Sequence, residues 1–233
     1  MRDHEAQPNI VLLPGLDGTG ILLEELASKL AENFDVTVIT YPMDASLGYK
    51  ELTALVRAQL PDKPFILLGE SFSGPIAIEL AVQEKERMAG LVLAATFAKA
   101  PKPRFLTPLI SLYHSALAPA WLSRALLLSG FGDNVLSRKL QTVLTSLPDA
   151  VVRKRLREVM AVDKTEFLHQ IECPTLYFSG KKDRLIGAKP AELIQNKVPN
   201  CQAQTLDAPH MLLATRVDEV VELVREYSRG MAG

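Results

Sequence analysis

The sequence has little cysteine and almost no net charge, and each shortage excludes a class of protein. Its 233 residues contain two cysteines, too few for the disulfide scaffold of a small secreted domain, and this favours a reducing compartment. The formal net charge of −1 lacks the basic excess expected of a nucleic-acid-binding protein. The four histidines have no cysteine or carboxylate neighbours at spacings typical of zinc sites. We therefore expect no nucleic-acid partner, no metal and no cofactor.

Uninterrupted hydrophobic runs are also scarce. Residues 1–5 are charged and lead to the first apolar segment without the hydrophobic region of a secretory signal. The longest apolar stretch, 105–131, is interrupted by prolines, serines, a histidine and an arginine, which argues against a membrane span. The sequence thus predicts no integral membrane segment and, together with its two cysteines, a cytoplasmic location.

Short apolar runs alternate with helical patterns along most of the chain, which predicts βα units and a mostly parallel sheet. Hydrophobic residues make up 48% of the composition, enough to bury a sizeable core. The expected strands are 9–13, 36–41, 65–68, 91–95, 175–178 and 203–206. The expected helices are 21–33, 49–60, 72–85, 190–197 and 212–227. This pattern predicts an α/β fold with about six strands flanked by helices.

The βα rhythm disappears between residues 98 and 170. This segment is rich in leucine at helical spacings, and Pro101 and Pro103 mark its entry. We expect a helical cap (lid) over 98–170, inserted into a core made of 1–97 and 171–233. A basic run at 153–157 within this segment is interpreted as the solvated face of an amphipathic helix, with a phosphate-bearing substrate handle as the alternative.

One serine lies between an apolar strand and an apolar helix, in the segment 69–74 (GESFSG). Such a sharp strand-to-helix turn presents the side chain of Ser71 clear of the backbone, beside the free amides of a helix start. This geometry suits a nucleophile that attacks a carbonyl carbon. The alternative is a tight connection in which Gly69 and Ser71 only satisfy backbone geometry.

A serine hydroxyl needs a base, and the base needs an orienting group. Asp183 ends the segment 179–183 (SGKKD) after one predicted strand, and His210 ends the segment 208–210 (APH) after the next. Both therefore lie at carboxyl ends of strands, where open α/β sheets bind ligands. Taken singly, Asp183 could be a solvated turn carboxylate and His210 a residue that merely opens a helix.

The first predicted strand is followed by a glycine-rich turn at 13–20 (LPGLDGTG). Its glycines allow the backbone to approach a ligand closely. One interpretation is an oxyanion loop in which the Leu16 amide donates alongside the Phe72 amide. Phosphate binding and a turn without function are the alternatives, although neither the dinucleotide fingerprint nor the P-loop pattern is present.

These four segments resemble those of the α/β-hydrolase superfamily, in its small esterase and thioesterase-like branch. The resemblance extends over nearly the whole chain. It implies a catalytic triad of Ser71, Asp183 and His210, and an oxyanion hole at Leu16 and Phe72. The family's Gly-x-Ser-x-Gly elbow has Ser73 at its last position here, followed by Gly74. The turn at 13–20 also looks like that of hydrolase-fold acyltransferases that act on long-chain acyl groups.

From the triad and the apolar cap we expect a serine hydrolase of class EC 3.1 that cleaves a carboxylic ester or thioester through an acyl-enzyme. An apolar roof favours an acyl or aromatic group in the small-molecule substrate. The cap residues expected to line the pocket are Phe105, Leu109, Tyr113, Trp121 and Phe131. The alternatives are acyl transfer to an alcohol, a non-catalytic ligand-binding protein, and C–C bond cleavage or cofactor-free peroxidation by the same triad.

Overall fold

Six parallel strands form one sheet in the order β2-β1-β3-β4-β5-β6. The computed structural model describes residues 8–101, 107–110, 114 and 120–231. The strands are β1 (Asn9–Leu13), β2 (Asp35–Val38), β3 (Phe65–Glu70), β4 (Met88–Ala94), β5 (Thr175–Gly180) and β6 (Cys201–Leu206). This sheet confirms the predicted α/β class.

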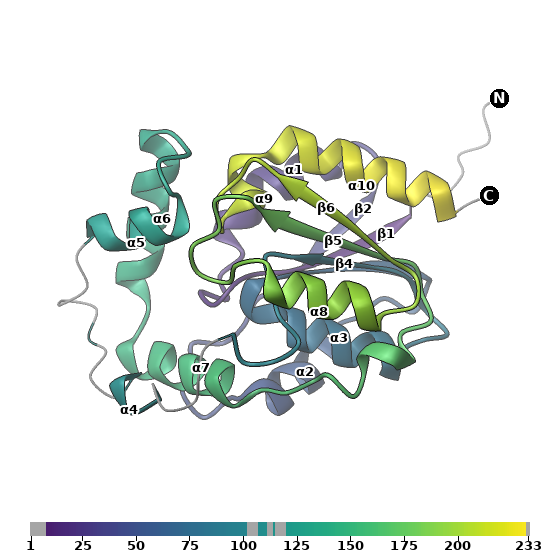
Figure 1. Ribbon diagram of the computed structural model, residues 1–233, viewed down its shortest axis with the longest axis horizontal. Helices are drawn as coiled ribbons and strands as arrows, with labels where there is room; N and C mark the ends of the chain where they lie inside the picture. The colour runs from purple at the N-terminus through teal and green to yellow at the C-terminus, as the bar shows by residue number, and fades with distance from the viewer. Residues whose placement is uncertain (1–7, 102–106, 111–113, 115–119, 232–233) are drawn as a thin grey trace.

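Helices cover both faces of the sheet (Figure 1). One face packs against α1 (Glu24–Leu30), α9 (Leu212–Thr215) and α10 (Val217–Met231). The other packs against α2 (Tyr49–Arg57), α3 (Gly74–Gln83) and α8 (Lys189–Lys197). The central strands are therefore apolar at almost every position, as expected where no face meets water.

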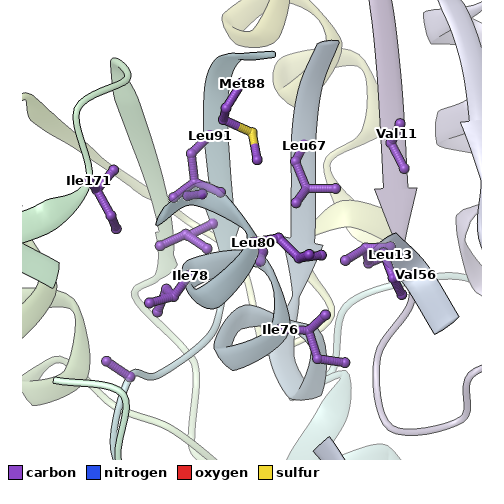
Figure 2. Packing of buried hydrophobic residues seen from close by; sticks show 14 of the residues in the cluster. Val11, Leu13, Val56, Leu67, Ile76, Ile78, Leu80, Met88, Leu91 and Ile171 are labelled. Atoms are coloured by element: carbon purple, nitrogen blue, oxygen red, sulfur yellow. The ribbon is translucent and has the colours of Figure 1, made fainter. Parts of the chain in front are cut away.

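The central strands β1 and β3 show how this double burial works. Ile10 and Leu12 pack on the α1 side, whereas Val11 and Leu13 pack on the α3 side. Figure 2 shows side chains from neighbouring strands, Leu67 among them, beside those of α3. Alternate residues point to opposite faces, so an apolar run of this kind ties both helical layers to one sheet.

The chain order creates a crevice between β1 and β3. From β1 the chain passes to β2 on one side, and then returns to place β3 on the other side. The helices that follow β1 and β3 lie on opposite faces of the sheet, so the two loops diverge. Such a switch point is where open α/β sheets bind ligands. The two loops at this switch point are the glycine-rich turn and the Ser71 turn.

The segment between β4 and β5 is helical where the structure describes it. It contains α4 (Thr107–Ile110), α5 (Ala120–Leu127), α6 (Asn134–Ser146), α7 (Asp149–Ala161) and the short 3-10 helix η5 (Leu168–Gln170). Helices α5, α6 and α7 lie at the end of the molecule to which the arrows of β5 and β6 point (Figure 1). They are therefore at the same edge of the sheet as the Ser71 turn.

Several predicted elements have other bounds in the structure, and two of these differences have a clear cause. The second strand ends at Val38 instead of residue 41, because beyond Ile39 the chain turns so that the Tyr41 amide donates to Gly18. The C-terminal helix is divided at Arg216, whose backbone is not helical and whose guanidinium donates to the Asp207 carbonyl. Both breaks bring a loop towards the sheet edge that carries Ser71.

Removing a side chain from the centre of the core should lower the free energy of unfolding substantially. Leu67 of β3 is completely buried, so Leu67→Ala leaves a cavity and should lower the free energy of unfolding by about 2 to 5 kcal/mol in urea titrations. Val135→Ala, at the exposed start of α6, is the control and should change it by less than about 0.5 kcal/mol. Equal effects of the two substitutions would contradict this packing.

Candidate active site

Ser71 stands on a strained turn between β3 and α3. Its backbone φ is 48°, in the left-handed region that residues other than glycine rarely adopt. The turn is possible because glycines flank it: a Cβ at Gly69 would lie 2.8 Å from the Ala77 Cβ, and one at Gly74 would overlap Thr96. The Thr96 hydroxyl also donates to the Ser71 carbonyl. The strain is thus maintained by close packing of the helix on the strand.

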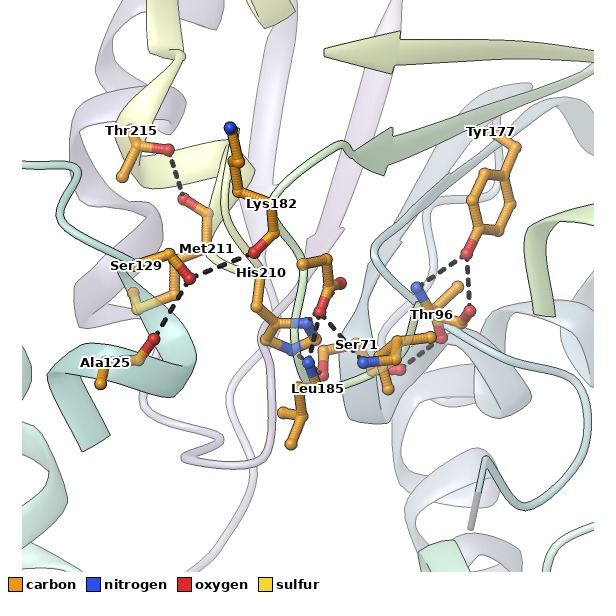
Figure 3. Close-up of polar contacts among 12 residues, drawn as sticks. Ser71, Thr96, Ala125, Ser129, Tyr177, Lys182, Leu185, His210, Met211 and Thr215 are labelled. Carbon is orange, nitrogen blue, oxygen red and sulfur yellow. Dashed lines mark hydrogen bonds and ion pairs between the residues drawn. The ribbon is translucent and has the colours of Figure 1, made fainter. Parts of the chain in front are cut away.

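The Ser71 hydroxyl lies next to an imidazole that a carboxylate orients. Ser71 Oγ is 2.8 Å from His210 Nε2, and His210 Nδ1 is 2.9 Å from Asp183 Oδ2. Figure 3 shows the His210 ring beside Ser71, with Thr96 and Tyr177 behind the serine. A histidine held in this way can accept a proton at Nε2 while its other nitrogen donates to the acid.

Asp183 is fixed as a charged acceptor. Its Oδ1 accepts hydrogen bonds from the amides of Leu185 and Ile186 at 2.8 and 3.0 Å. Burial by itself would raise the pKa of Asp183, but the hydrogen bond from His210 and those two amides lower it below its ordinary value. The carboxylate therefore stays ionised and accepts the hydrogen bond from His210 Nδ1.

The glycine-rich turn is tied to the Ser71 turn through Ser73, the residue that departs from the family's glycine. The buried Ser73 hydroxyl donates to the Pro14 carbonyl and accepts from the Tyr41 hydroxyl. Phe72 is fixed as well, because its ring stacks on Tyr49 at 4.7 Å and its carbonyl accepts from the Tyr49 hydroxyl. The glycine-rich turn and the backbone of Phe72 are thus each held by a hydrogen bond from a buried side chain.

A cavity of about 370 Å³ opens beside Ser71 and His210. Its walls are largely apolar and come from the core and from the segment between β4 and β5. Side chains on this wall include Phe97, Ile110, Leu140, Leu144, Val159 and Met160. A cavity of this size and lining suits a small apolar ligand group next to the serine.

Of the five residues predicted to line the pocket, two line another hollow and two lie outside the described residues. Trp121 and Phe131 line a separate hollow of about 270 Å³, where Trp121 is 69% exposed and the Arg216 guanidinium lies 5.0 Å above the Phe131 ring. The structure therefore places these two at a different hollow from the cavity beside Ser71. Phe105 and Tyr113 lie outside the described residues, and Leu109 belongs to α4 beside the lining residue Ile110.

Sequence reasoning missed two carboxyl groups at this cavity. Glu70 and Asp17 are both buried and both contribute to its lining. Burial and the neighbouring Asp17 raise the pKa of Glu70 to about 8, although the Gly15 amide donates to its carboxyl. Glu70 is therefore largely protonated at neutral pH. The position before the serine in the elbow gave no signal of this, because burial depends on the neighbouring loops.

The interpretation of the basic run 153–157 is wrong for one of its members. Arg155 of α7 is 2% exposed and donates to the carbonyls of Leu16, Asp17 and Pro42. A signal was present in the sequence, since Arg155 lies midway between Val151 and Val159 at helical spacing and so shares their apolar stripe.

Other groups show no sign of a second chemistry in the described part of the chain. Within the described ranges, no three histidine, cysteine or carboxylate side chains gather closely enough to hold a metal ion. Burial raises the pKa of the Cys173 thiol to about 12 and that of Cys201 to about 11, so both stay protonated. Among the helices that the structure describes, none combines the length and apolarity needed to span a bilayer.

Comparisons with known proteins agree with this geometry. A pimeloyl-[acyl-carrier protein] methyl ester esterase of Aeromonas salmonicida is 24% identical over 94% of this chain and 95% of its own length. Phytyl ester synthase 2 of Arabidopsis thaliana is 31% identical over 37% of this chain, a match that spans only 13% of the plant protein. The crystal structure of an enol-lactonase from Burkholderia xenovorans superimposes with a TM-score of 0.85 at 18% identity, covering 97% of this chain and 93% of that one.

The parallel sheet, the strained serine turn and the acid and histidine loops define the protein as an α/β-hydrolase. A family model described as "Serine aminopeptidase, S33" matches residues 44–214, well over half of the sequence. The chain belongs to this family of α/β-hydrolases.

The buried Glu70 carboxyl predicts a pH-dependent stability. Its folded-state pKa of about 8 lies above its ordinary value of 4.5, so the folded state binds more protons and the wild type loses stability as pH rises between these values. Glu70→Gln removes this loss. In urea titrations the variant should gain at least about 1 kcal/mol over wild type between pH 5 and pH 9.

The exposed Glu86→Gln is the matched control and should show no such gain. A difference between Glu70→Gln and wild type that stays constant across this pH range would show that Glu70 is ionised in the folded protein.

Proposed function

We propose that this protein hydrolyses carboxylic esters or thioesters with an apolar acyl group. The observation that carries the proposal is the continuous chain of contacts from Ser71 through His210 to Asp183, at 2.8 and 2.9 Å. Ser71 and His210 also line a largely apolar cavity. The full-length similarity to an enzyme named as an ester hydrolase supports the same reaction class.

In the proposed mechanism, Ser71 Oγ attacks the acyl carbon while His210 Nε2 accepts its proton. Asp183 orients the imidazole and stabilises the imidazolium. The amides of Leu16 and Phe72 donate to the oxyanion, and each such donor is typically worth about 3 kcal/mol of transition-state stabilisation. His210 then protonates the leaving alcohol or thiol. Water attacks the acyl-enzyme, His210 accepts the proton of that water, and the acid is released with Ser71 restored.

The segment 98–170 is proposed to act as the cap of this site. The cavity wall receives Ile110 from α4, Leu127 from α5, Leu140 and Leu144 from α6, and Val159 and Met160 from α7, so four helices of the segment contribute to it. Apolar walls stabilise an acyl chain and offer nothing to a sugar or a charged metabolite. The two free cysteines fit a reducing compartment such as the cytoplasm.

Acyl transfer to an alcohol is the second candidate, because the stretch that matches phytyl ester synthase 2 is 31% identical. The same acyl-enzyme would serve both reactions, and they differ in whether water or an alcohol attacks it. Adding dodecanol to an assay with p-nitrophenyl octanoate separates them. Octanoic acid as the sole product supports hydrolysis, whereas dodecyl octanoate as the main product supports transfer.

Ser71→Ala tests the proposed nucleophile. We expect its turnover of p-nitrophenyl octanoate to fall by about 10⁴-fold or more, since removing a nucleophile that acts together with its base disables the whole unit. The wild type should also react with a fluorophosphonate at Ser71, as mass spectrometry of the labelled peptide would show. Ser28→Ala, at an exposed position of α1, is the control. Near-normal turnover in Ser71→Ala would rule out this mechanism, and so would an unlabelled wild type.

Because the matching family model is described as a serine aminopeptidase, cleavage of an ester should be compared with cleavage of an aminopeptidase substrate. We expect the wild type to cleave p-nitrophenyl octanoate far faster than leucine p-nitroanilide, because the cavity wall offers apolar contacts to an acyl chain. Preference for the anilide in kcat/KM would replace the esterase proposal by a peptidase one.

Leu144→Trp tests whether the cavity binds the acyl chain. The larger side chain would fill part of the cavity, so kcat/KM for p-nitrophenyl octanoate should fall by about tenfold or more, whereas kcat/KM for p-nitrophenyl acetate should change little. Val135→Trp, on the exposed start of the same helix, is the matched control. Equal losses on both esters would place the acyl chain elsewhere.

A further inference from the structure

The buried arginine of α7 contacts the turn that carries one of the proposed oxyanion donors. Arg155 Nη1 donates to the carbonyls of Leu16 and Asp17, both at 2.8 Å, and Nη2 donates to the Pro42 carbonyl at 2.9 Å. The guanidinium thus joins the turn after β1 to the loop after β2. A charged group with 2% exposure is costly to bury unless such partners compensate it, so this contact is a built feature of the fold.

The turn is shaped to receive this guanidinium. Gly18 has a φ of +71°, and a Cβ there would lie 2.7 Å from Arg155 Nη1. Any other residue at position 18 would therefore displace the arginine as well as strain the turn. The Arg155 guanidinium also lies 5.8 Å from the centre of the Tyr41 ring, whose hydroxyl contacts Ser73. The two sides of the turn are thus fixed by Ser73 from the core and by Arg155 from α7.

The same helix also contacts the second proposed donor through one further residue. Glu158, nearly one turn after Arg155, accepts from the Tyr49 amide at 3.0 Å, at the start of α2. Tyr49 in turn stacks on Phe72 and donates to its carbonyl. One polar face of α7 therefore contacts the surroundings of both donors, while Val159 and Met160 of the same helix line the cavity.

We propose that Arg155 is a positioning residue for the oxyanion hole. The carbonyls of Leu16 and Asp17 belong to the two peptide planes that follow the Leu16 amide, so fixing them limits rotation of the turn and keeps that amide aimed at the developing oxyanion. This inference rests on the proposed function. It adds that a residue of the segment between β4 and β5, remote in sequence from the triad, sets the rate of the chemical step.

An arginine is required because its planar group donates in several fixed directions at once, whereas a lysine ammonium is a single point donor. Arg155→Met should lower kcat for p-nitrophenyl octanoate by about tenfold or more while KM stays nearly constant, since a donor aimed at the transition state does not hold the ground state. Arg155→Lys should have an intermediate kcat. The pH profile of kcat should keep its shape, because the triad is unchanged.

Arg157→Met is the matched control, since Arg157 lies on the same helix and is exposed. It should keep the wild-type kcat and KM. Each variant is assayed at a temperature where circular dichroism shows it to be folded, and Arg155→Lys supplies the test if Arg155→Met does not fold. The same variants should bind an octyl trifluoromethyl ketone more weakly than wild type, because that inhibitor forms an oxyanion on Ser71.

Three results would overturn the inference. These are a wild-type kcat in the Arg155 variants, a loss confined to KM, and unchanged affinity for the trifluoromethyl ketone. Failure of the proposed function is a separate outcome, because the wild type itself would then neither cleave the ester nor react at Ser71 with a fluorophosphonate.

Discussion

The hydrogen bond between Ser71 Oγ and His210 Nε2 is the contact on which the site depends. It joins residues 139 positions apart, so it forms only if β3 and β6 are held at a fixed separation. The intervening strands β4 and β5 provide this spacing through a continuous parallel ladder. Because parallel strands end at the same edge, the loops that carry the serine, the acid and the histidine all open in one direction. The apolar packing of both sheet faces is therefore what keeps the polar contacts in place.

The segment between β4 and β5 contacts each of the loops that form the site. The Leu127 carbonyl accepts from the amide of Met211, next to His210. The Ser129 hydroxyl donates to the carbonyl of Lys182, next to Asp183 (Figure 3). Arg155 contacts the glycine-rich turn in the same manner. This segment is thus joined to the backbone of the Asp183 loop, the His210 loop and the glycine-rich turn. Its helices form the wall of the cavity and also constrain the geometry at its floor.

Two buried carboxyl groups of the site, Asp183 and Glu70, have pKa values shifted in opposite directions. Asp183 is surrounded by donors and stays ionised, whereas Glu70, close to Asp17 and away from water, has its pKa raised. These two acids thus differ in charge because donors surround only Asp183, whereas burial and a neighbouring acid dominate at Glu70. A neutral Glu70 adds no charge to the cavity beside Ser71. The charged Asp183 instead contacts Nδ1 of His210, the ring nitrogen that does not contact Ser71.

The positions of the strands along the chain, the loss of the βα rhythm after the fourth strand and the choice of Ser71, Asp183 and His210 as candidates rest on local patterns. Periodicity, glycine placement and the positions that follow strands are all properties of short segments. The role of Arg155, the state of Glu70 and the orientation of Trp121 and Phe131 could not be read in this way. Each depends on which distant loop lies opposite the side chain, and so on burial. The sequence alone therefore determined which residues stand at the sheet edge, and the tertiary structure decided which of them face the cavity, because burial and charge state arise from contacts between segments far apart in the chain.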